Sequence, residues 1–285
     1  MSHAAATPGP AAPRGHHRGR LSHVSTRVGS LAVEEIGQGP PLLLWPSLLS
    51  DRHLWRHQRD ALAPHHRLLL VDPPGHGESG PPRGRYRLED CARAGTEVLD
   101  AFEVSSAVWV GLSWGGMTAL YAALRHPERV RALALLDTSA DRLRLGERLR
   151  FRLLAALFRR TGLTPFLARR VAAELLGATT LRERPDLAAE LTGPLALLER
   201  GGVLRAIDAV LFRRRTFTGE LGGVAAPALV VVGEEDRSTP AVHAERIAAA
   251  LPRARLERVP RAGHLTALEA PEAVNRLLAG FLAEL

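Results

Sequence analysis

Residues 107–126, AVWVGLSWGGMTALYAALRH, decide the fold of this chain. An apolar run typical of a fully buried strand comes first, and a run with helical composition follows it. Between them lies Gly111-Leu112-Ser113-Trp114-Gly115, a G-x-S-x-G motif typical of a sharp strand-to-helix turn. Large side chains do not fit beside such a turn, so glycines flank it and the serine hydroxyl projects above the sheet. Ser113 is therefore the candidate nucleophile, and the alternative is a serine in a tight turn without reactivity.

Strand-like and helix-like segments alternate on both sides of this stretch. Gly29 and Ser30 separate the first two expected strands, and they predict a hairpin turn there. Strands are expected at 23–28, 31–36, 41–45, 67–72, 106–110, 130–137, 228–233 and 254–259. Helices are expected at 54–62, 88–102, 117–126, 241–251 and from 271 onward. Because helices connect most of these strands, the predicted fold is α/β, with a mostly parallel central sheet of about eight strands flanked by helices.

One segment interrupts this alternation. Residues 139–215 are rich in Leu, Ala and Arg at helical spacing and contain no strand pattern. The sequence therefore predicts a core domain made of residues 22–138 and 216–285, with 139–215 as a helical cap over the ends of the strands.

The first residues have a different composition. Residues 1–21 are rich in Ala, Pro, Gly, His and Arg, and they contain no apolar stretch of the signal-peptide kind. We expect a disordered tail, in which His16 and His17 are solvated side chains rather than metal ligands. Arg interrupts every Leu-rich stretch of the chain, so no segment reaches the roughly 20 apolar residues that span a bilayer.

The basic and sulfur-containing residues exclude several classes of enzyme. All 38 basic residues are Arg, so the chain has no lysine for a Schiff base, a pyridoxal phosphate or a phosphate-binding loop. Cys91 is the single cysteine, which excludes an intrachain disulfide and a cysteine zinc site. Its place on the apolar face of the helix expected at 88–102 predicts a small buried side chain. A lone thiol fits a cytoplasmic protein.

The net charge of +8 is concentrated in the predicted cap. Residues 139–215 hold 16 Arg and 8 acidic residues, whereas the rest of the chain holds 22 of each. An anion is the partner that this excess implies, and arginines near a site could hold a substrate carboxylate. The alternatives are a solvated helical surface and membrane-surface binding by residues 148–160. No nucleic-acid-binding motif accompanies the charge.

A serine hydroxyl needs a base, and the base needs a carboxylate to orient it. His264 follows the last expected strand, and Asp236 follows the strand at 228–233. Sites gather where parallel strands end, and the order Ser113, Asp236, His264 is the order expected for such a sheet. Together the three residues predict a catalytic triad.

Other polar residues compete for these roles. Asp137 ends the strand that follows the nucleophile helix and is the main alternative to Asp236. Glu234 and Glu235 lie beside Asp236 in sequence. His76, in PPGHGESG, is interpreted as a residue that orders its loop rather than as a second base.

The segments GLSWGG, VDPPGHGES, VVGEEDRSTP and AGH together resemble the α/β-hydrolase superfamily, from about residue 22 to the C-terminus. Residues 46–55, PSLLSDRHLW, resemble the corresponding loop of 3-oxoadipate enol-lactonases and related small carboxylesterases. The chain has Pro46 and Ser47 where many relatives have His-Gly, and Leu49 where the lactonases usually have Gly.

This resemblance implies a function. It implies hydrolysis of a small ester or lactone through an acyl-enzyme, without a metal or an organic cofactor. It assigns the backbone N–H groups of Leu48 and Trp114 as the donors that bind the oxyanion. Carbon–carbon bond hydrolases, cofactor-free haloperoxidases and acyltransferases share the triad and remain alternatives. A non-catalytic ligand-binding relative is an alternative of another class.

Overall fold

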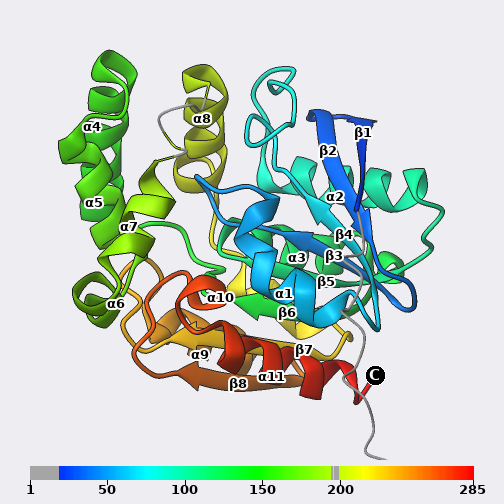
Figure 1. The fold of residues 1–285 in the computed structure, drawn as a ribbon. Coiled ribbons are helices and arrows are strands. Elements are labelled where there is room, and N and C mark those ends of the chain that lie inside the picture. The colour runs from blue at the N-terminus through cyan, green and yellow to red at the C-terminus, as the bar shows by residue number, and fades with distance from the viewer. Residues whose placement is uncertain (1–18, 194, 196–198) are drawn as a thin grey trace, which may run out of the picture.

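The computed structural model describes residues 19–193, 195 and 199–285, which are built around one eight-stranded sheet (Figure 1). The order across the sheet is β1-β2-β4-β3-β5-β6-β7-β8. β2 pairs antiparallel with β1 and with β4, and the other neighbouring strands are parallel. The strands are β1 (Arg20–Thr26), β2 (Gly29–Ile36), β3 (Pro41–Trp45), β4 (Arg67–Val71), β5 (Ala107–Leu112), β6 (Val130–Leu136), β7 (Ala228–Gly233) and β8 (Ala254–Val259). The predicted α/β class with a mostly parallel sheet is confirmed.

Helices cover both faces of this sheet. Apolar side chains of α2, α3 and α9 pack on one face, and those of α1, α10 and α11 pack on the other. Successive side chains of a strand point to opposite faces, so Leu43 of β3 joins the first cluster while Leu42 and Leu44 join the second. The helices are α1 (Arg56–Leu62), α2 (Leu88–Ala101), α3 (Trp114–Arg125), α9 (Ala241–Ala250), α10 (Thr266–Glu269) and α11 (Pro271–Leu282). None of the described helices is long and apolar enough to cross a membrane.

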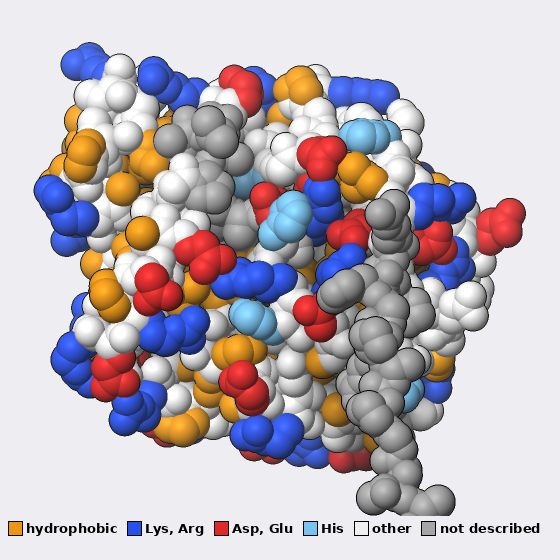
Figure 2. All heavy atoms as spheres, in the orientation of Figure 1, with side chains coloured by type: hydrophobic (Ala, Val, Ile, Leu, Met, Phe, Trp, Pro, Cys, Tyr) orange, Lys and Arg blue, Asp and Glu red, His pale blue; other side chains and the backbone are white. Residues whose placement is uncertain are grey.

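A second group of helices lies between β6 and β7 in the sequence. Figure 1 shows these helices gathered on one side of the sheet. They are α4 (Leu145–Thr161), α5 (Pro165–Leu175), α6 (Ala178–Glu183), α7 (Pro185–Thr192) and α8 (Arg200–Ile207), and the π-helix η4 (Asp208–Phe212) follows them. The described part of 139–215 contains no strand, as expected. α4 exposes four leucines, Leu145, Leu149, Leu153 and Leu157, and hydrophobic side chains are visible at the surface on this side of the molecule (Figure 2).

The sheet begins earlier in the sequence than predicted. Residues 1–18, which include both tail histidines, lie outside the described residues. The prediction of a tail up to residue 21 is wrong for Arg20 and Leu21, which open β1 and pair with Glu35 and Glu34 of β2. Arg20 also forms an ion pair with Glu35 at 3.1 Å. This cross-strand partner is invisible in the local sequence pattern.

The first hairpin turn is also displaced from the predicted position. The turn is Arg27-Val28, and Gly29 already belongs to β2, where it pairs with Thr26. The hydroxyl of Thr26 donates a hydrogen bond to the carbonyl oxygen of Gly29 at 2.7 Å. Gly29 has a φ of 136°, a conformation that other residues rarely adopt. The glycine therefore marks the first residue of the strand rather than the turn.

Candidate active site

Ser113 stands between β5 and α3 in a strained backbone conformation. Its φ of 54° and ψ of −106° are unfavourable for a residue with a side chain. The surrounding chain fixes this conformation: the Ser113 N–H donates to the Leu136 carbonyl at 2.8 Å, and the Thr138 hydroxyl donates to the Ser113 carbonyl at 2.7 Å. Such strain, held by neighbouring strands, is typical of a functional turn.

The glycines beside Ser113 are required by close packing of the backbone. A Cβ atom on Gly111 would lie 2.2 Å from the carbonyl carbon of Gly115. A Cβ atom on Gly115 would lie 1.8 Å from the carbonyl oxygen of Trp45, at the end of β3. The motif therefore lets α3 start directly against β3, with Ser113 at the tip of the turn.

His264 contacts Ser113 although 151 positions separate them in sequence. The His264 Nε2 atom lies 2.9 Å from the Ser113 Oγ atom, within hydrogen-bonding distance. The loop after β8 that carries His264 is held by Glu269, whose Oε1 atom accepts from the N–H groups of Gly263 at 3.0 Å and Leu265 at 3.1 Å. The backbone N–H of His264 donates to the Leu175 carbonyl at 3.0 Å.

Asp236 lies on the other side of the imidazole. Its Oδ2 atom is 2.9 Å from the His264 Nδ1 atom, and both groups are buried. The Oδ1 atom accepts the backbone N–H groups of Ser238 at 2.8 Å and Thr239 at 2.9 Å. The Thr239 hydroxyl donates to Oδ2 at 2.8 Å. These donors hold the Asp236 carboxylate in place beside the His264 ring. In this arrangement Nδ1–H of the ring points at the carboxylate, and Nε2 faces Ser113.

The pKa values of this pair shift in opposite directions. Burial alone would raise the pKa of Asp236, but the charge of His264 and the hydrogen bonds from His264 and Thr239 lower it below the usual value. Burial alone would lower the pKa of His264, but the charge of Asp236 and its hydrogen bond raise it. The pair therefore favours a carboxylate next to a ring that can take up a proton.

Asp137, the alternative carboxylate, is fully buried but engaged elsewhere. Its Oδ1 atom accepts the Gly233 N–H at 3.0 Å. Its Oδ2 atom accepts the Thr266 hydroxyl at 2.6 Å and the Thr266 N–H at 3.1 Å. Burial, together with the charge of Asp236, raises the pKa of Asp137 well above its usual value. Among the described residues, Asp236 rather than Asp137 is the carboxylate hydrogen-bonded to His264.

The other competing residues have separate roles. Glu235 accepts hydrogen bonds from the N–H and the hydroxyl of Thr179 in α6, and Glu234 is exposed. His76 is buried with its ring 5.6 Å from that of Trp114, and burial lowers its pKa to about 4.

Cys91 is buried, as expected, and burial raises the pKa of its thiol. No group of three potential metal ligands occurs within the described ranges.

The loop after β3 lies next to the serine. Leu48 lines the same cavity as Ser113 and His264, and the Gly115 N–H donates to the Pro46 carbonyl at 3.2 Å, which ties this loop to the first turn of α3. Trp114 is the first residue of α3, so its N–H has no preceding helical turn to donate to. Neither N–H group takes part in a hydrogen bond between described residues.

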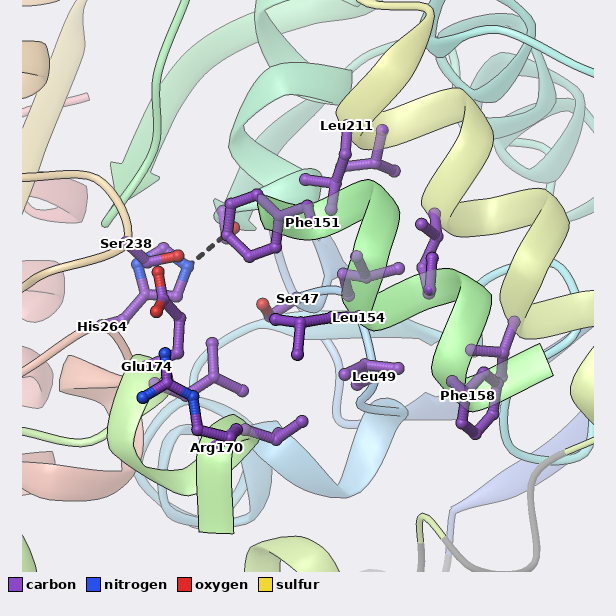
Figure 3. A pocket seen from close by; sticks show the side chains of 18 of the residues that line it. Ser47, Leu49, Phe151, Leu154, Phe158, Arg170, Glu174, Leu211, Ser238 and His264 are labelled. Carbon is purple, nitrogen blue, oxygen red and sulfur yellow. Dashed lines mark hydrogen bonds between the residues drawn. The ribbon is translucent and has the colours of Figure 1, made fainter. Parts of the chain in front are cut away.

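A cavity of about 160 Å³ lies over Ser113 and His264. Most of its wall is apolar and comes from α4, α5 and the segment from α8 to η4. Figure 3 shows Phe151, Leu154 and Phe158 of α4 directed into it, opposite His264. Arg170, Glu174 and Arg214 also line it and are its charged residues besides the histidine.

Sequence patterns did not identify several residues that hold this site. Thr239 and Thr266 bind the two carboxylates, and the carboxylate of Glu269 joins the histidine loop to α6 by accepting the Gly177 N–H at 2.8 Å and the Thr180 hydroxyl at 2.6 Å. A threonine three residues after Asp236 is a local signal, because short polar side chains favour such turns. No comparable signal marks Glu269.

Comparisons with known proteins agree with this fold. The family model for the alpha/beta hydrolase fold matches residues 40–271. The chain is 26% identical over 236 residues to a 3-oxoadipate enol-lactonase of Acinetobacter baylyi, covering 83% of this chain and 86% of that protein. It is 30% identical over 263 residues to a putative carbamate hydrolase of Azorhizobium caulinodans, covering 90% and 96%. A solved thermophilic esterase from Thermogutta terrifontis superposes with a TM-score of 0.86 at 28% identity, covering 93% of this chain and 98% of that one.

Proposed function

The chain belongs to the alpha/beta hydrolase fold family, and on this premise we propose that it is a serine hydrolase that cleaves a small carboxylic ester or lactone through an acyl-enzyme. One observation carries the proposal. The Ser113 hydroxyl lies 2.9 Å from the His264 ring, which lies 2.9 Å from the Asp236 carboxylate, in the wall of a cavity. The names of the enol-lactonase and esterase relatives support the choice of ester bonds.

The reaction begins with a proton transfer. His264 Nε2 accepts the hydroxyl proton of Ser113 as Oγ attacks the carbonyl carbon of the substrate. The negative charge that forms on the carbonyl oxygen is bound by the backbone N–H groups of Leu48 and Trp114. Collapse of this intermediate breaks the bond to the leaving oxygen, which takes its proton from His264.

The second half of the reaction repeats these steps with water. His264 removes a proton from water, the resulting hydroxide attacks the acyl-enzyme, and the bond to Ser113 Oγ breaks as the serine recovers its proton. The product is a carboxylic acid. In a lactone the leaving alcohol remains attached to that acid. Asp236 stabilises the imidazolium formed in both halves, in keeping with the raised pKa of His264.

The helices α4 to α8 act as the cap of this site. Their side chains form most of the apolar wall of the cavity, and the excess of arginine in 139–215 makes the cap basic. The cap excludes water from part of the cavity and selects the substrate by shape, whereas Ser113 and His264 come from the core.

The nucleophile is tested by covalent labelling with a fluorophosphonate probe. We expect wild-type protein to be labelled at Ser113 and Ser113→Ala to remain unlabelled. Ser105→Ala is the matched control, because this serine is exposed and precedes β5, at the end of the strand opposite Ser113, and its label should equal that of the wild type. Labelling of Ser113→Ala to the wild-type level would show that another residue is the nucleophile.

The reaction class is tested by turnover. A panel of p-nitrophenyl esters, aliphatic lactones and ring-cleavage dienones separates ester hydrolysis from carbon–carbon bond hydrolysis. Addition of an alcohol or of hydrogen peroxide to the ester assay detects acyl transfer or perhydrolysis. Absence of both labelling and turnover would contradict the proposal and favour a ligand-binding relative.

A further inference from the structure

Arg214 brings a positive charge into the wall of the apolar cavity. It follows η4 and lines the cavity together with Ser113. Its Nη1 atom donates to the sulfur of Met117 at 3.4 Å, a weak acceptor. Its Nε atom is buried and has no hydrogen-bond partner among the described residues. The guanidinium is therefore poorly satisfied by the protein itself.

No carboxylate neutralises this charge. Among the described residues, no carboxylate oxygen lies within 4 Å of the guanidinium, and residues 1–18, 194 and 196–198 contain no acidic residue. Asp141 and Glu147 favour the charged form of Arg214 from a distance, but each of these carboxylates has another partner. Asp141 pairs with Arg246 at 3.0 Å, and Glu147 accepts the Arg144 N–H at 2.8 Å.

The environment of Arg214 disfavours the charge that it carries. Burial lowers its pKa to about 10, so the group is protonated at neutral pH but has lost part of its contact with water. A half-buried charge whose Nε has no partner is unfavourable, and an anion that enters the cavity would relieve that cost. The cavity is therefore more complementary to a substrate with a negative charge than to a neutral one of equal shape.

The other arginine of the cavity is in a different situation. Arg170 is exposed to solvent, and it lies on α5 one turn before Glu174. Glu174 itself forms an ion pair with Arg150 of α4 at 2.9 Å. Water screens Arg170, so a substrate anion would gain less from it than from Arg214.

Arg214 and Ser113 line the same cavity, so an anion at Arg214 and a bond at Ser113 can belong to one small substrate. Its contact Met117 lies four residues after Ser113 in α3, which is about 6 Å along a helix axis. A carboxylate held by Arg214 would therefore lie a few bonds from a carbonyl carbon at Ser113 Oγ.

We propose that Arg214 binds a carboxylate of the substrate, so that the site selects carboxylate-bearing esters or lactones of the half-ester kind. This inference rests on the proposed serine hydrolase function. Arg214 is a specificity residue and takes no part in the proton transfers of Ser113 and His264.

The test compares matched pairs of substrates. Mono-p-nitrophenyl esters of succinate, glutarate and adipate are assayed beside p-nitrophenyl esters of neutral acids with the same number of carbon atoms. We expect wild-type kcat/KM to favour one of the charged esters. Arg214→Met keeps the unbranched apolar stem of the side chain and removes the charged guanidinium. It should lower kcat/KM for that ester about 100-fold, a larger loss than for the neutral ester of the same size. Arg214→Lys should retain part of the preference.

Two control variants test whether the preference for charged esters depends on Arg214 or on another arginine. Arg213→Met removes the exposed neighbouring arginine and should leave both substrates unaffected. Arg170→Met removes the other cavity arginine, and a loss of preference here instead of in Arg214→Met would overturn the proposal. Thermal unfolding of each variant shows that a lost preference does not arise from misfolding.

A binding measurement separates this inference from the proposed function. Ser113→Ala should bind monomethyl glutarate in calorimetry, and Ser113→Ala with Arg214→Met should not. If a protein that is labelled at Ser113 turns over charged and neutral esters equally, the proposed role of Arg214 is refuted and the serine hydrolase proposal is not. Absence of both labelling and turnover would refute the serine hydrolase proposal.

Discussion

Asp137 binds Thr266 through both the hydroxyl and the backbone N–H of the threonine, two residues beyond His264. The same carboxyl group binds the Gly233 N–H at the end of β7. Asp137 therefore joins the histidine loop to the strands β6 and β7. Its contacts are those of a structural anchor, and they differ from the contact of Asp236 with the imidazole ring.

Asp137→Asn tests this anchoring role. The carboxyl group accepts backbone N–H groups on both of its oxygens, so an amide must turn its own donors toward one of them. We expect the free energy of unfolding to fall by about 1–3 kcal/mol in urea denaturation, because one buried donor loses its acceptor. Activity at low temperature, where the variant is folded, should fall less than in Asp236→Asn. An unchanged stability would show that the anchor is not needed.

Asp236→Asn tests the orientation of the histidine. The substitution removes the charge that favours the imidazolium, and it permits the wrong tautomer of His264. We expect kcat for a p-nitrophenyl ester to fall by about 10³–10⁴-fold with a small change in KM. Glu234→Gln is the control, because this neighbouring carboxylate is exposed, and its kcat should equal that of the wild type. A loss of less than about tenfold in Asp236→Asn would contradict the assigned role.

The pH dependence of kcat/KM should report on His264. The ring acts as a base only when neutral, and although burial lowers its pKa, Asp236 raises the pKa above the usual value of 6.5. Activity should therefore fall as the pH decreases through this raised pKa. In Asp236→Asn the raising charge is absent, so the acid limb of the profile should move to lower pH. An acid limb that stays in place would show that Asp236 does not set this pKa.

Gly115→Ala tests the close contact between β3 and α3. The added methyl group would meet the carbonyl group of Trp45, which belongs to the backbone and cannot turn away. We expect a loss of about 3 kcal/mol in the free energy of unfolding, together with loss of labelling at Ser113. Gly280→Ala in α11 is the matched control, because a Cβ atom there meets nothing within 4 Å. This control should gain about 0.5–1 kcal/mol in stability.

The sequence was sufficient for the parts of the fold that have strong local patterns. The runs PLLLW, RLLLV and ALVVVG are strands as predicted, and the G-x-S-x-G motif joins a strand to a helix. The hairpin turn was misplaced because Gly29 opens a strand, and the start of β1 was missed because Arg20 pairs with a residue on another strand. Such pairings depend on contacts that a local pattern does not contain.

The choice between the two carboxylates also depends on contacts that a local sequence pattern does not contain. Asp137 and Asp236 both follow buried strands, so the sequence favoured Asp236 but kept Asp137 as the main alternative. Their difference arises from Thr239, which donates to Asp236, and from Thr266, which donates to Asp137. The assignment of the triad and of the oxyanion donors Leu48 and Trp114 remains a prediction that the labelling and kinetic experiments test.

The separation of the proposed nucleophile and base along the chain has a consequence for synthesis on the ribosome. The turn that carries residue 113 emerges long before the loop that carries residue 264, and a lone serine hydroxyl is a weak nucleophile. On the proposed mechanism, the growing polypeptide lacks the base that activates this serine until residue 264 has been made. Residue 264 follows β8 and contacts residue 113, so enzymatic activity in a translation reaction would report the finished tertiary structure.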